Sequence, residues 1–280
     1  MLSEFTQKLS NCTLTRVDID LEHHYYGNGE YFVSLTHILD IGAPFPEGLR
    51  QYLRVTDAAE SEERLTMTKD RGTKLHHALE MLASGMELYL EDYPTNYEKD
   101  AIVTFIRTMR FLFSDGLPKG SRQEVIVADP TRKVGGTLDF VGVADKRRLD
   151  ILLKPLGRLK LEGDNFELVK PLIGKTTPVK FIKDYKFTGR SSYNHMVQAS
   201  KYRDMYNQSY ATEKKASRAY IWRYSPKHKL HFDMKEAVLR PSSFNRIYDT
   251  TLDYLGGFPT PPVLTIYPES VRLWEVKNES

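Results

Sequence analysis

The apolar residues of this 280-residue chain change their spacing near its middle, and that change limits the folds the chain can adopt. Residues 58–82 and 97–113 carry apolar side chains at helical spacing. The apolar face of the first segment is formed by Leu65, Met67, Leu75, Leu79 and Leu82. From Arg122 onward the apolar residues recur as they do in strands. We therefore expect a mixed α/β fold in which two helices precede the sheet.

The rest of the chain extends this order. Residues 122–145, "RQEVIVADPTRKVGGTLDFVGVAD", predict two strands joined by an Asp-Pro turn and a Gly-Gly pair. The elements expected after them are a strand within 178–187, a helix over 192–206, a strand over 218–226, and a final helix over 243–255 that stops at Gly256-Gly257. Near the N-terminus, "YYGNGEYFVSLTHIL" at 25–39 predicts a hairpin that leads into a short helix.

Composition limits the class of protein and of metal site. The chain is 40% hydrophobic and 28% charged, which is typical of a globular protein, and its net charge of +3 permits a polyanionic partner without requiring one. Cys12 is the only cysteine, so disulfides within the chain and cysteine-built zinc or iron–sulfur sites are excluded. No signal peptide is recognisable, and no apolar run approaches the roughly 20 residues of a membrane span. We expect a soluble intracellular protein.

An acidic residue two positions before a lysine occurs four times, at Asp184/Lys186, Glu213/Lys215, Asp233/Lys235 and Glu275/Lys277. Such a pair is by itself typical of a solvated surface. The first pair differs because it lies on an apolar strand and follows an earlier apolar strand that carries Asp139. Side chains two apart on a strand share a face, so Asp184 and Lys186 point to one site while Tyr185 faces the other way.

If the two strands pair, two carboxylates and an ammonium group converge. Mg²⁺ and Mn²⁺ prefer carboxylate oxygens and leave coordination positions for water and a phosphate. Lys186 would orient or deprotonate the attacking water, or neutralise the charge that builds on the phosphate. The pattern predicts phosphodiester hydrolysis.

Four helical residues extend the pattern, although each is weak by itself. Gly72 and His76 lie one helical turn apart, and a glycine inside a helix suggests the close approach of another element. Gln198 and Tyr202 share one face of the later helix, where an amide and a phenol could hold a DNA backbone or stack on a base. Taken separately, these residues are more typical of ordinary helix surfaces or cores.

Together, the motifs Gly72-x-x-x-His76, Gly136-x-x-Asp139, Asp184-Tyr185-Lys186 and Gln198-x-x-x-Tyr202 resemble the RecB-type branch of the PD-(D/E)XK nucleases. The resemblance covers about residues 70–225, and the N-terminal "YYGNGEYFVSLTHILD" resembles the opening of the mitochondrial genome maintenance exonuclease and its phage relatives. It implies a restriction-endonuclease-like core, with a central mixed β-sheet flanked by helices and an N-terminal helical and hairpin elaboration.

The resemblance also implies the residue roles. His76, Asp139 and Asp184 would be metal ligands together with the backbone carbonyl of Tyr185, and Lys186 would be the catalytic lysine. Gln198 and Tyr202 would position DNA. Glu124, on the strand before Asp139, would be a supporting acid.

The chain departs from the family pattern in three respects. Val33 and Leu35 replace the Pro and Val of the N-terminal signature, a change expected to affect packing more than chemistry. Asp139 and Asp184 are 184 − 139 = 45 residues apart, and a basic insertion at 147–178 accounts for the excess. This insertion is either a DNA-contacting flap or a solvated surface hairpin. With one cysteine, the iron–sulfur subtype of the family is excluded.

The sequence therefore predicts a Mg²⁺- or Mn²⁺-dependent DNA exonuclease that acts on single strands or duplex ends by metal-activated water. The alternatives are a structure- or sequence-specific endonuclease of the same fold and a non-catalytic DNA-end-binding recombination protein; RNA stays open as a substrate. We expect a monomer in the cytoplasm of a bacterium or phage-infected cell, with the mitochondrial matrix less favoured, and with replication or recombination proteins as further partners.

We expect one nuclease domain over 1–280. It would comprise an N-terminal extension (1–55), a catalytic core (56–225) that contains the insertion, and a C-terminal helix and tail (226–280). His23-His24 and His76-His77 lack partners at zinc-ligand spacing, and no phosphate-binding loop or serine-nucleophile motif is present.

Overall fold

The computed structural model describes residues 3–19, 22–44, 47–113, 121–153, 159–162, 165–168, 172–187, 191–224, 226, 232–259 and 261. Its helices are α1 (Leu35–Gly42), α2 (Glu47–Val55), α3 (Ala58–Ala83), the 3₁₀ turn η1 (Leu90–Asp92), α4 (Asn96–Leu112), α5 (Lys146–Leu153), α6 (Tyr193–Ser209) and α7 (Pro241–Leu255). Its strands are β1 (Ser3–Lys8), β2 (Thr13–Ile19), β3 (Glu22–Gly27), β4 (Glu30–Ser34), β5 (Arg122–Asp129), β6 (Val134–Asp145), β7 (Leu159–Glu162), β8 (Asn165–Leu168), β9 (Pro178–Lys186), β10 (Arg218–Arg223) and β11 (Asp233–Glu236).

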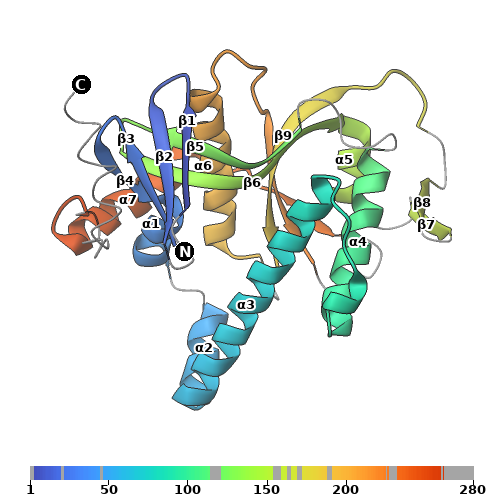
Figure 1. Ribbon diagram of the computed structural model, residues 1–280, viewed down its shortest axis with the longest axis horizontal. Coiled ribbons are helices and arrows are strands. Elements are labelled where there is room, and N and C mark those ends of the chain that lie inside the picture. Colours follow the sequence, from blue (N-terminus) through green and yellow to red (C-terminus); the bar gives the residue numbers. More distant parts are fainter. Residues whose placement is uncertain are drawn as a thin grey trace.

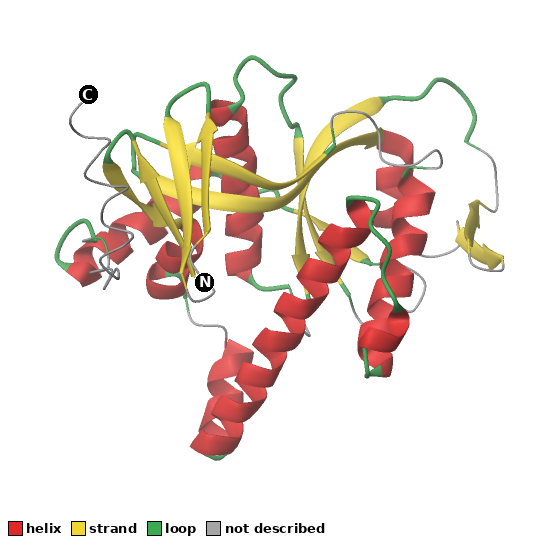
Figure 2. Ribbon diagram, viewed as in Figure 1, coloured by secondary structure: helices red, strands yellow, loops and turns green. Residues whose placement is uncertain are grey.

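Nine of the described strands form one mixed sheet. Its order is β1-β2-β3-β4-β6-β9-β10-β11, and β5 pairs with β6 beside this path. The pairs β4–β6 and β9–β10 are parallel and the others are antiparallel. Helices flank the sheet (Figures 1 and 2), so the expectation of a mixed α/β fold with a helix-flanked central sheet is confirmed.

Two apolar clusters form the core. Residues of α1, α6 and α7 belong to one cluster, and residues of α3, α4 and α5 belong to the other. The strands β9 and β10 contribute to both: Ile182 and Ile221 belong to the first cluster, whereas Phe181 and Trp222 belong to the second. This alternation is the two-residue period of a strand buried on both faces. The side chain of Trp222 is fully buried in this core.

Helix ends follow signals in the sequence. Ser192 and His195 form a capping box at the start of α6, and Thr95 and Glu98 form another at the start of α4. Helix α7 ends at Gly256, whose φ of 68° lies in the left-handed region that glycine adopts without strain. The expected helices over 58–82, 97–113, 192–206 and 243–255 are thus confirmed with small shifts of their ends.

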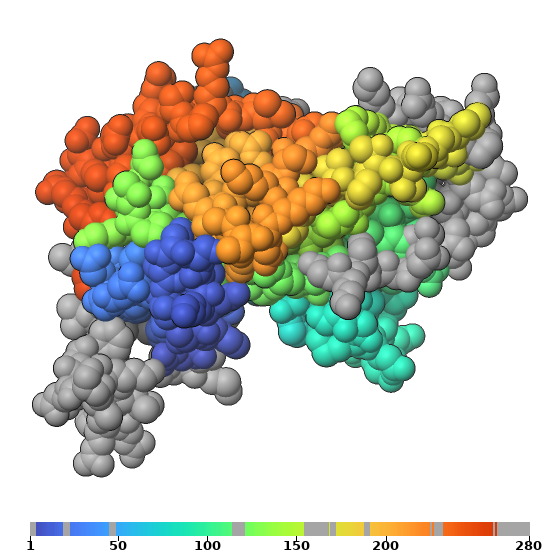
Figure 3. All heavy atoms as spheres, turned by 90° about the horizontal axis from the view of Figure 1, so that it is seen from above, coloured from blue at the N-terminus to red at the C-terminus, as the bar shows by residue number. Residues whose placement is uncertain are grey.

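The expected element order is wrong at the N-terminus, because four strands precede the long helices. The hairpin β3–β4 and the short helix α1 are where the sequence predicts them, but β1 and β2 were not anticipated. Both are rich in polar residues, and β1 lies at the edge of the sheet, so their alternation of apolar and polar residues is weak. Figure 3 shows the N-terminal segments against the C-terminal part of the chain, and the Thr251 hydroxyl of α7 donates to the Ile38 carbonyl of α1 at 3.0 Å.

The first half of α3 does not pack as the sequence suggested. Leu75 and Leu79 are fully buried, whereas 42% of Leu65 and 64% of Met67 are exposed. In Figure 1 this half of α3 extends away from the sheet together with α2, so its apolar residues have no core to join. The close approach expected at Gly72 is also absent, since no other element of the described chain comes within 4 Å of a Cβ built there.

The insertion at 147–178 is only partly described. It begins with α5, which the sequence did not predict, and it contains the hairpin β7–β8, so the choice between a DNA-contacting flap and a solvated surface hairpin stays open. Three basic side chains of α5 are engaged within the protein: Lys146 with Asp150, Arg147 with Asp145, and Arg148 with the Phe111 carbonyl. Residues 154–158, 163–164 and 169–171 lie outside the described part of the insertion.

Within the described residues, none of the helices combines the length and the apolar character needed to cross a bilayer.

Candidate active site

The predicted acidic residues meet where β6 and β9 part. The two strands pair antiparallel from Asp145–Pro178 to Phe140–Lys183, and Asp139 and Asp184 are the next residue on each strand beyond the last backbone pair. The spacing of 45 residues is therefore compatible with neighbouring strands, because the chain leaves the sheet through α5 and β7–β8 before it returns as β9.

The Asp139 carboxylate closes the gap between the separating strands. Its Oδ2 accepts a hydrogen bond from the Tyr185 backbone N–H at 2.6 Å and lies 3.6 Å from His76 Nδ1. The His76 ring is held edge-on to Tyr185 and Phe187, with centroids at 5.9 and 5.3 Å. Helix α3 thus brings His76 to the strand residues, which is the position that the resemblance implies for it.

Asp184 and Lys186 form an ion pair beside Asp139. Lys186 Nζ lies 2.8 Å from Asp184 Oδ2, and the side chain of Asp184 is only 3% exposed. Asp184 Oδ2 is buried against this ammonium group, and no other described residue donates a hydrogen bond to it. An oxygen in that position is suited to a further cationic partner.

Burial and charge set the protonation of these groups. Burial, reinforced by the charge of Asp139, raises the pKa of Asp184 to about 6 even though Lys186 lowers it. Burial lowers the pKa of Lys186, but the attraction of Asp184, Asp139 and Asp40 outweighs it and the net pKa is raised. Burial and the charge of Lys186 lower the pKa of His76 to about 4, so His76 is neutral at pH 7. A protonated lysine favours charge neutralisation over deprotonation of water.

Glu124 on β5 lies opposite Asp139 on β6. The register places the two residues opposite each other, but the backbone pair is missing there, and Glu124 has a φ of 45°. A glutamate in the left-handed region is strained, and such residues concentrate at functional sites. Burial, Asp139 and Glu80 raise the pKa of Glu124 to about 7, while Arg16, 3.2 Å away, lowers it. The supporting acid predicted from the sequence therefore lies beside the pair of aspartates.

Gln198 and Tyr202 are brought toward the same site by α6, but both are buried, with exposures of 8% and 3%. Their side chains hydrogen-bond to each other, and the charges of Asp184 and Asp139 act on the Tyr202 hydroxyl. The ring of Tyr202 covers Gly136, where a Cβ would lie 2.6 Å from Tyr202 Cε1. Gly136 is therefore needed for α6 to approach the β6 strand that carries Asp139.

Lys183, the neighbour of Asp184 on β9, shows that the two faces of this strand have different environments. Lys183 is fully buried on the face opposite Asp184, and its Nζ lies 3.9 Å from the ring centroid of Phe140 and 4.0 Å from that of Trp222. Burial lowers the pKa of Lys183 far below its ordinary value. Of these two lysines, Lys186 shares the strand face of Asp184, as the alternation predicts.

Sequence reasoning missed three residues near the site. Glu80 lies one turn after His76 on α3 and lines the same pocket, so the helical spacing could have identified it. His195 precedes Gln198 by three residues on α6, and burial together with the charge of Lys186 lowers its pKa to about 4. Asp40 on α1 acts on Lys186 electrostatically, and nothing in its sequence context marks it.

The residues of the candidate site meet part of what a hard divalent cation requires of its ligands. Within the described chain, no three His, Cys, Asp or Glu side chains are grouped closely enough to enclose a metal ion. Mg²⁺, however, is commonly bound by one or two carboxylates, with waters and substrate phosphates as the other ligands. The pair Asp139 and Asp184 meets that smaller requirement, because the two carboxylates lie opposite each other beyond the last backbone pair of β6 and β9.

Comparison with known proteins adds no relative. No protein-family model matches the chain, and no curated protein matches its sequence. The candidate active site is therefore argued from its own geometry, and the resemblance in the motifs stays a prediction.

Proposed function

We propose that this protein is a divalent-metal-dependent DNA exonuclease with a RecB-type PD-(D/E)XK core, which hydrolyses phosphodiester bonds of single strands or duplex ends. The observation that carries the proposal is the meeting of Asp139, Asp184 and Lys186 at the point where β6 and β9 part. Two close carboxylates in a buried setting repel each other, and a bound cation would relieve that cost.

Asp139 and Asp184, with the backbone carbonyl of Tyr185 and the neutral His76 beside them, are the residues that would hold Mg²⁺ or Mn²⁺. When bound, such an ion supplies positive charge to phosphate oxygens and lowers the pKa of water. Each aspartate has a fixed position: Asp139 is held by the Tyr185 N–H, and Asp184 is buried against Lys186.

Lys186 would neutralise the charge that develops on the phosphate. Its side chain is 18% exposed, and the surrounding acids keep its ammonium group protonated. A fixed cation in a partly dry site stabilises a transition-state charge more than a solvated one does. Gln198 and Tyr202 would position the DNA strand indirectly, through the neighbouring side chains that they hold in place, because little of either side chain reaches solvent.

The substrate topology separates this function from its alternatives. The purified protein is incubated with Mg²⁺ and either an end-labelled linear single strand or a covalently closed circle, beside the Asp184→Asn variant. We expect stepwise shortening of the linear strand, an intact circle, and no cleavage by the variant. Cleavage of the circle would indicate an endonuclease. Binding of linear DNA without metal-dependent cleavage of either substrate would overturn the assignment in favour of a DNA-end-binding protein.

A further inference from the structure

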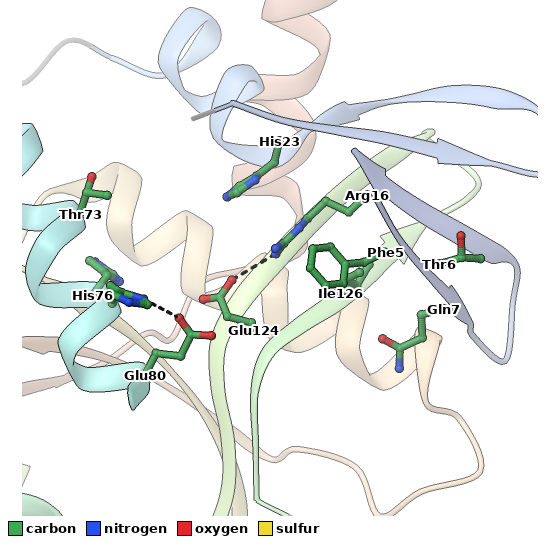
Figure 4. Close-up of a pocket in the computed structure, with 11 residues that line it drawn as sticks. Phe5, Thr6, Gln7, Arg16, His23, Thr73, His76, Glu80, Glu124 and Ile126 are labelled. Carbon is green, nitrogen blue, oxygen red and sulfur yellow. Dashed lines mark hydrogen bonds and ion pairs between the residues drawn. The ribbon is translucent and has the colours of Figure 1, made fainter. Parts of the chain in front are cut away.

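A cavity of about 540 Å³ adjoins the candidate active site (Figure 4). His76 and Glu124 form its inner side, and the edge of α3 forms another wall through Thr73, His77 and Glu80. The opposite wall comes from the N-terminal strands β1 and β2, which contribute Phe5 and Arg16. The cavity is within the size range of small-ligand sites, and it lies next to the atoms proposed to hold the metal.

Phe5 presents an open aromatic surface in this cavity. Half of its surface, 51%, is exposed, although it sits on a strand whose partner covers it on one side. Arg16 lies opposite Phe5 in the β1–β2 register, and its guanidinium is 5.1 Å from the ring centroid. Arg16 is fixed in turn by Asp18 at 3.0 Å and Glu124 at 3.2 Å. Arg16 therefore contacts both the Phe5 ring and Glu124 of the candidate active site.

The charges of the cavity favour a base over a phosphate. Its one arginine is already paired with two carboxylates, and Glu80 adds another negative charge to the wall. Among the described residues that line the cavity, no lysine and no arginine without an acidic partner is offered to a phosphate, whereas Lys186 lies with the aspartates of the candidate active site. An uncharged base can stack on an aromatic ring.

Resting on the nuclease function proposed above, we infer that this cavity binds the base of a nucleotide that flanks the scissile phosphate of a single-stranded DNA end, with Phe5 as its stacking platform. The N-terminal strands then form part of the substrate site.

The test compares Phe5→Ala with Phe5→Trp and with the control Tyr254→Ala, which removes an exposed aromatic from α7 that lines neither described cavity. Binding of a fluorescent single strand is measured in the Lys186→Met background without divalent metal, so cleavage does not interfere. Because stacking contributes about 1–3 kcal/mol per base, Phe5→Ala should weaken binding about 5- to 150-fold. Phe5→Trp and Tyr254→Ala should bind as the parent does.

A second substrate makes the inference specific. Oligonucleotides with a single abasic position are scanned along the end of the strand. At one position near the end, removal of the base should weaken binding to the parent protein as much as Phe5→Ala weakens binding of the normal oligonucleotide. Binding of that abasic oligonucleotide to Phe5→Ala should show no further loss. Additive losses of affinity at every position, or equal binding by Phe5→Ala and its parent, would overturn the inference that Phe5 is a stacking platform. Cleavage by the wild type is scored separately, so a failed nuclease proposal is distinguishable from a failed platform.

Discussion

Asp184 lies in an environment that disfavours its charged form. Its carboxylate is 3% exposed, faces Asp139, and has a pKa raised from 3.8 to about 6. Between these pH values the folded state retains a proton that the unfolded chain has released. The free energy of unfolding therefore falls as pH rises through this window. Such a residue is destabilising at pH 7 unless a cation binds to it.

The variant Asp184→Asn should consequently be more stable than the wild type in EDTA at pH 7.5, since the amide mimics the neutral carboxyl group. A shift of this size corresponds to a gain on the order of 1–3 kcal/mol. Urea unfolding at pH 7.5 and pH 3.5 measures it, and the gain should vanish at the lower pH. A variant that is less stable than the wild type at pH 7.5 would show that the Lys186 pair outweighs the burial of Asp184.

At the scale of elements, the packing of α6 on β6 brings Tyr202 within reach of the site. Gly136→Ala would place a Cβ 2.6 Å from Tyr202 Cε1. We expect a loss of about 1–3 kcal/mol in the free energy of unfolding, because the ring must shift in a packed core. Denaturant unfolding measures the loss, and an unchanged midpoint would mean that α6 can move without cost.

For the glycine inside helix α3 we expect an alanine substitution to have the opposite effect on stability. Gly72 lies inside the helix with nothing within 4 Å of a built Cβ. Gly72→Ala should therefore raise stability by up to about 1 kcal/mol, as expected for a helix interior. Thermal unfolding of the variant beside Gly136→Ala provides a paired comparison of the two glycines. If Gly72→Ala also lowers stability, the helix is not regular at this position in solution.

The sequence predicted the elements whose pattern is strong. The long helices and β5, β6, β9 and β10 have clear periods, and the site residues on β9 follow from simple alternation. The strands β1 and β2 were missed because their stability comes from distant partners: Leu14 of β2 packs in the same cluster as Val127 of β5. Arg16 was missed as a partner of Glu124 for the same reason, since 108 residues separate them.

At the scale of the whole molecule, the N-terminal strands share a hydrophobic core with the elements that carry the candidate active site. Leu14 is fully buried in the cluster that contains α6 residues. Leu14→Ala should lower the free energy of unfolding by about 2–5 kcal/mol. In a Trp274→Phe background, the emission of Trp222, which lies in the other cluster, should report the same shift as far-UV circular dichroism. Separate transitions would indicate that the two clusters unfold independently.

The central claim, that the junction of β6 and β9 is a nuclease centre, depends on Lys186 facing the aspartates. Lys180 is a matched control, because it lies on the same strand and forms its own ion pair with Glu213 at 2.7 Å, away from Asp184. The deciding measurement is the single-turnover rate at which an end-labelled DNA strand is shortened in Mg²⁺ by the wild type, Lys186→Met and Lys180→Met. We predict at least a roughly 100-fold loss for Lys186→Met, with retained DNA binding, and near wild-type cleavage by Lys180→Met. Equal rates for Lys186→Met and the wild type would contradict the assignment of this site.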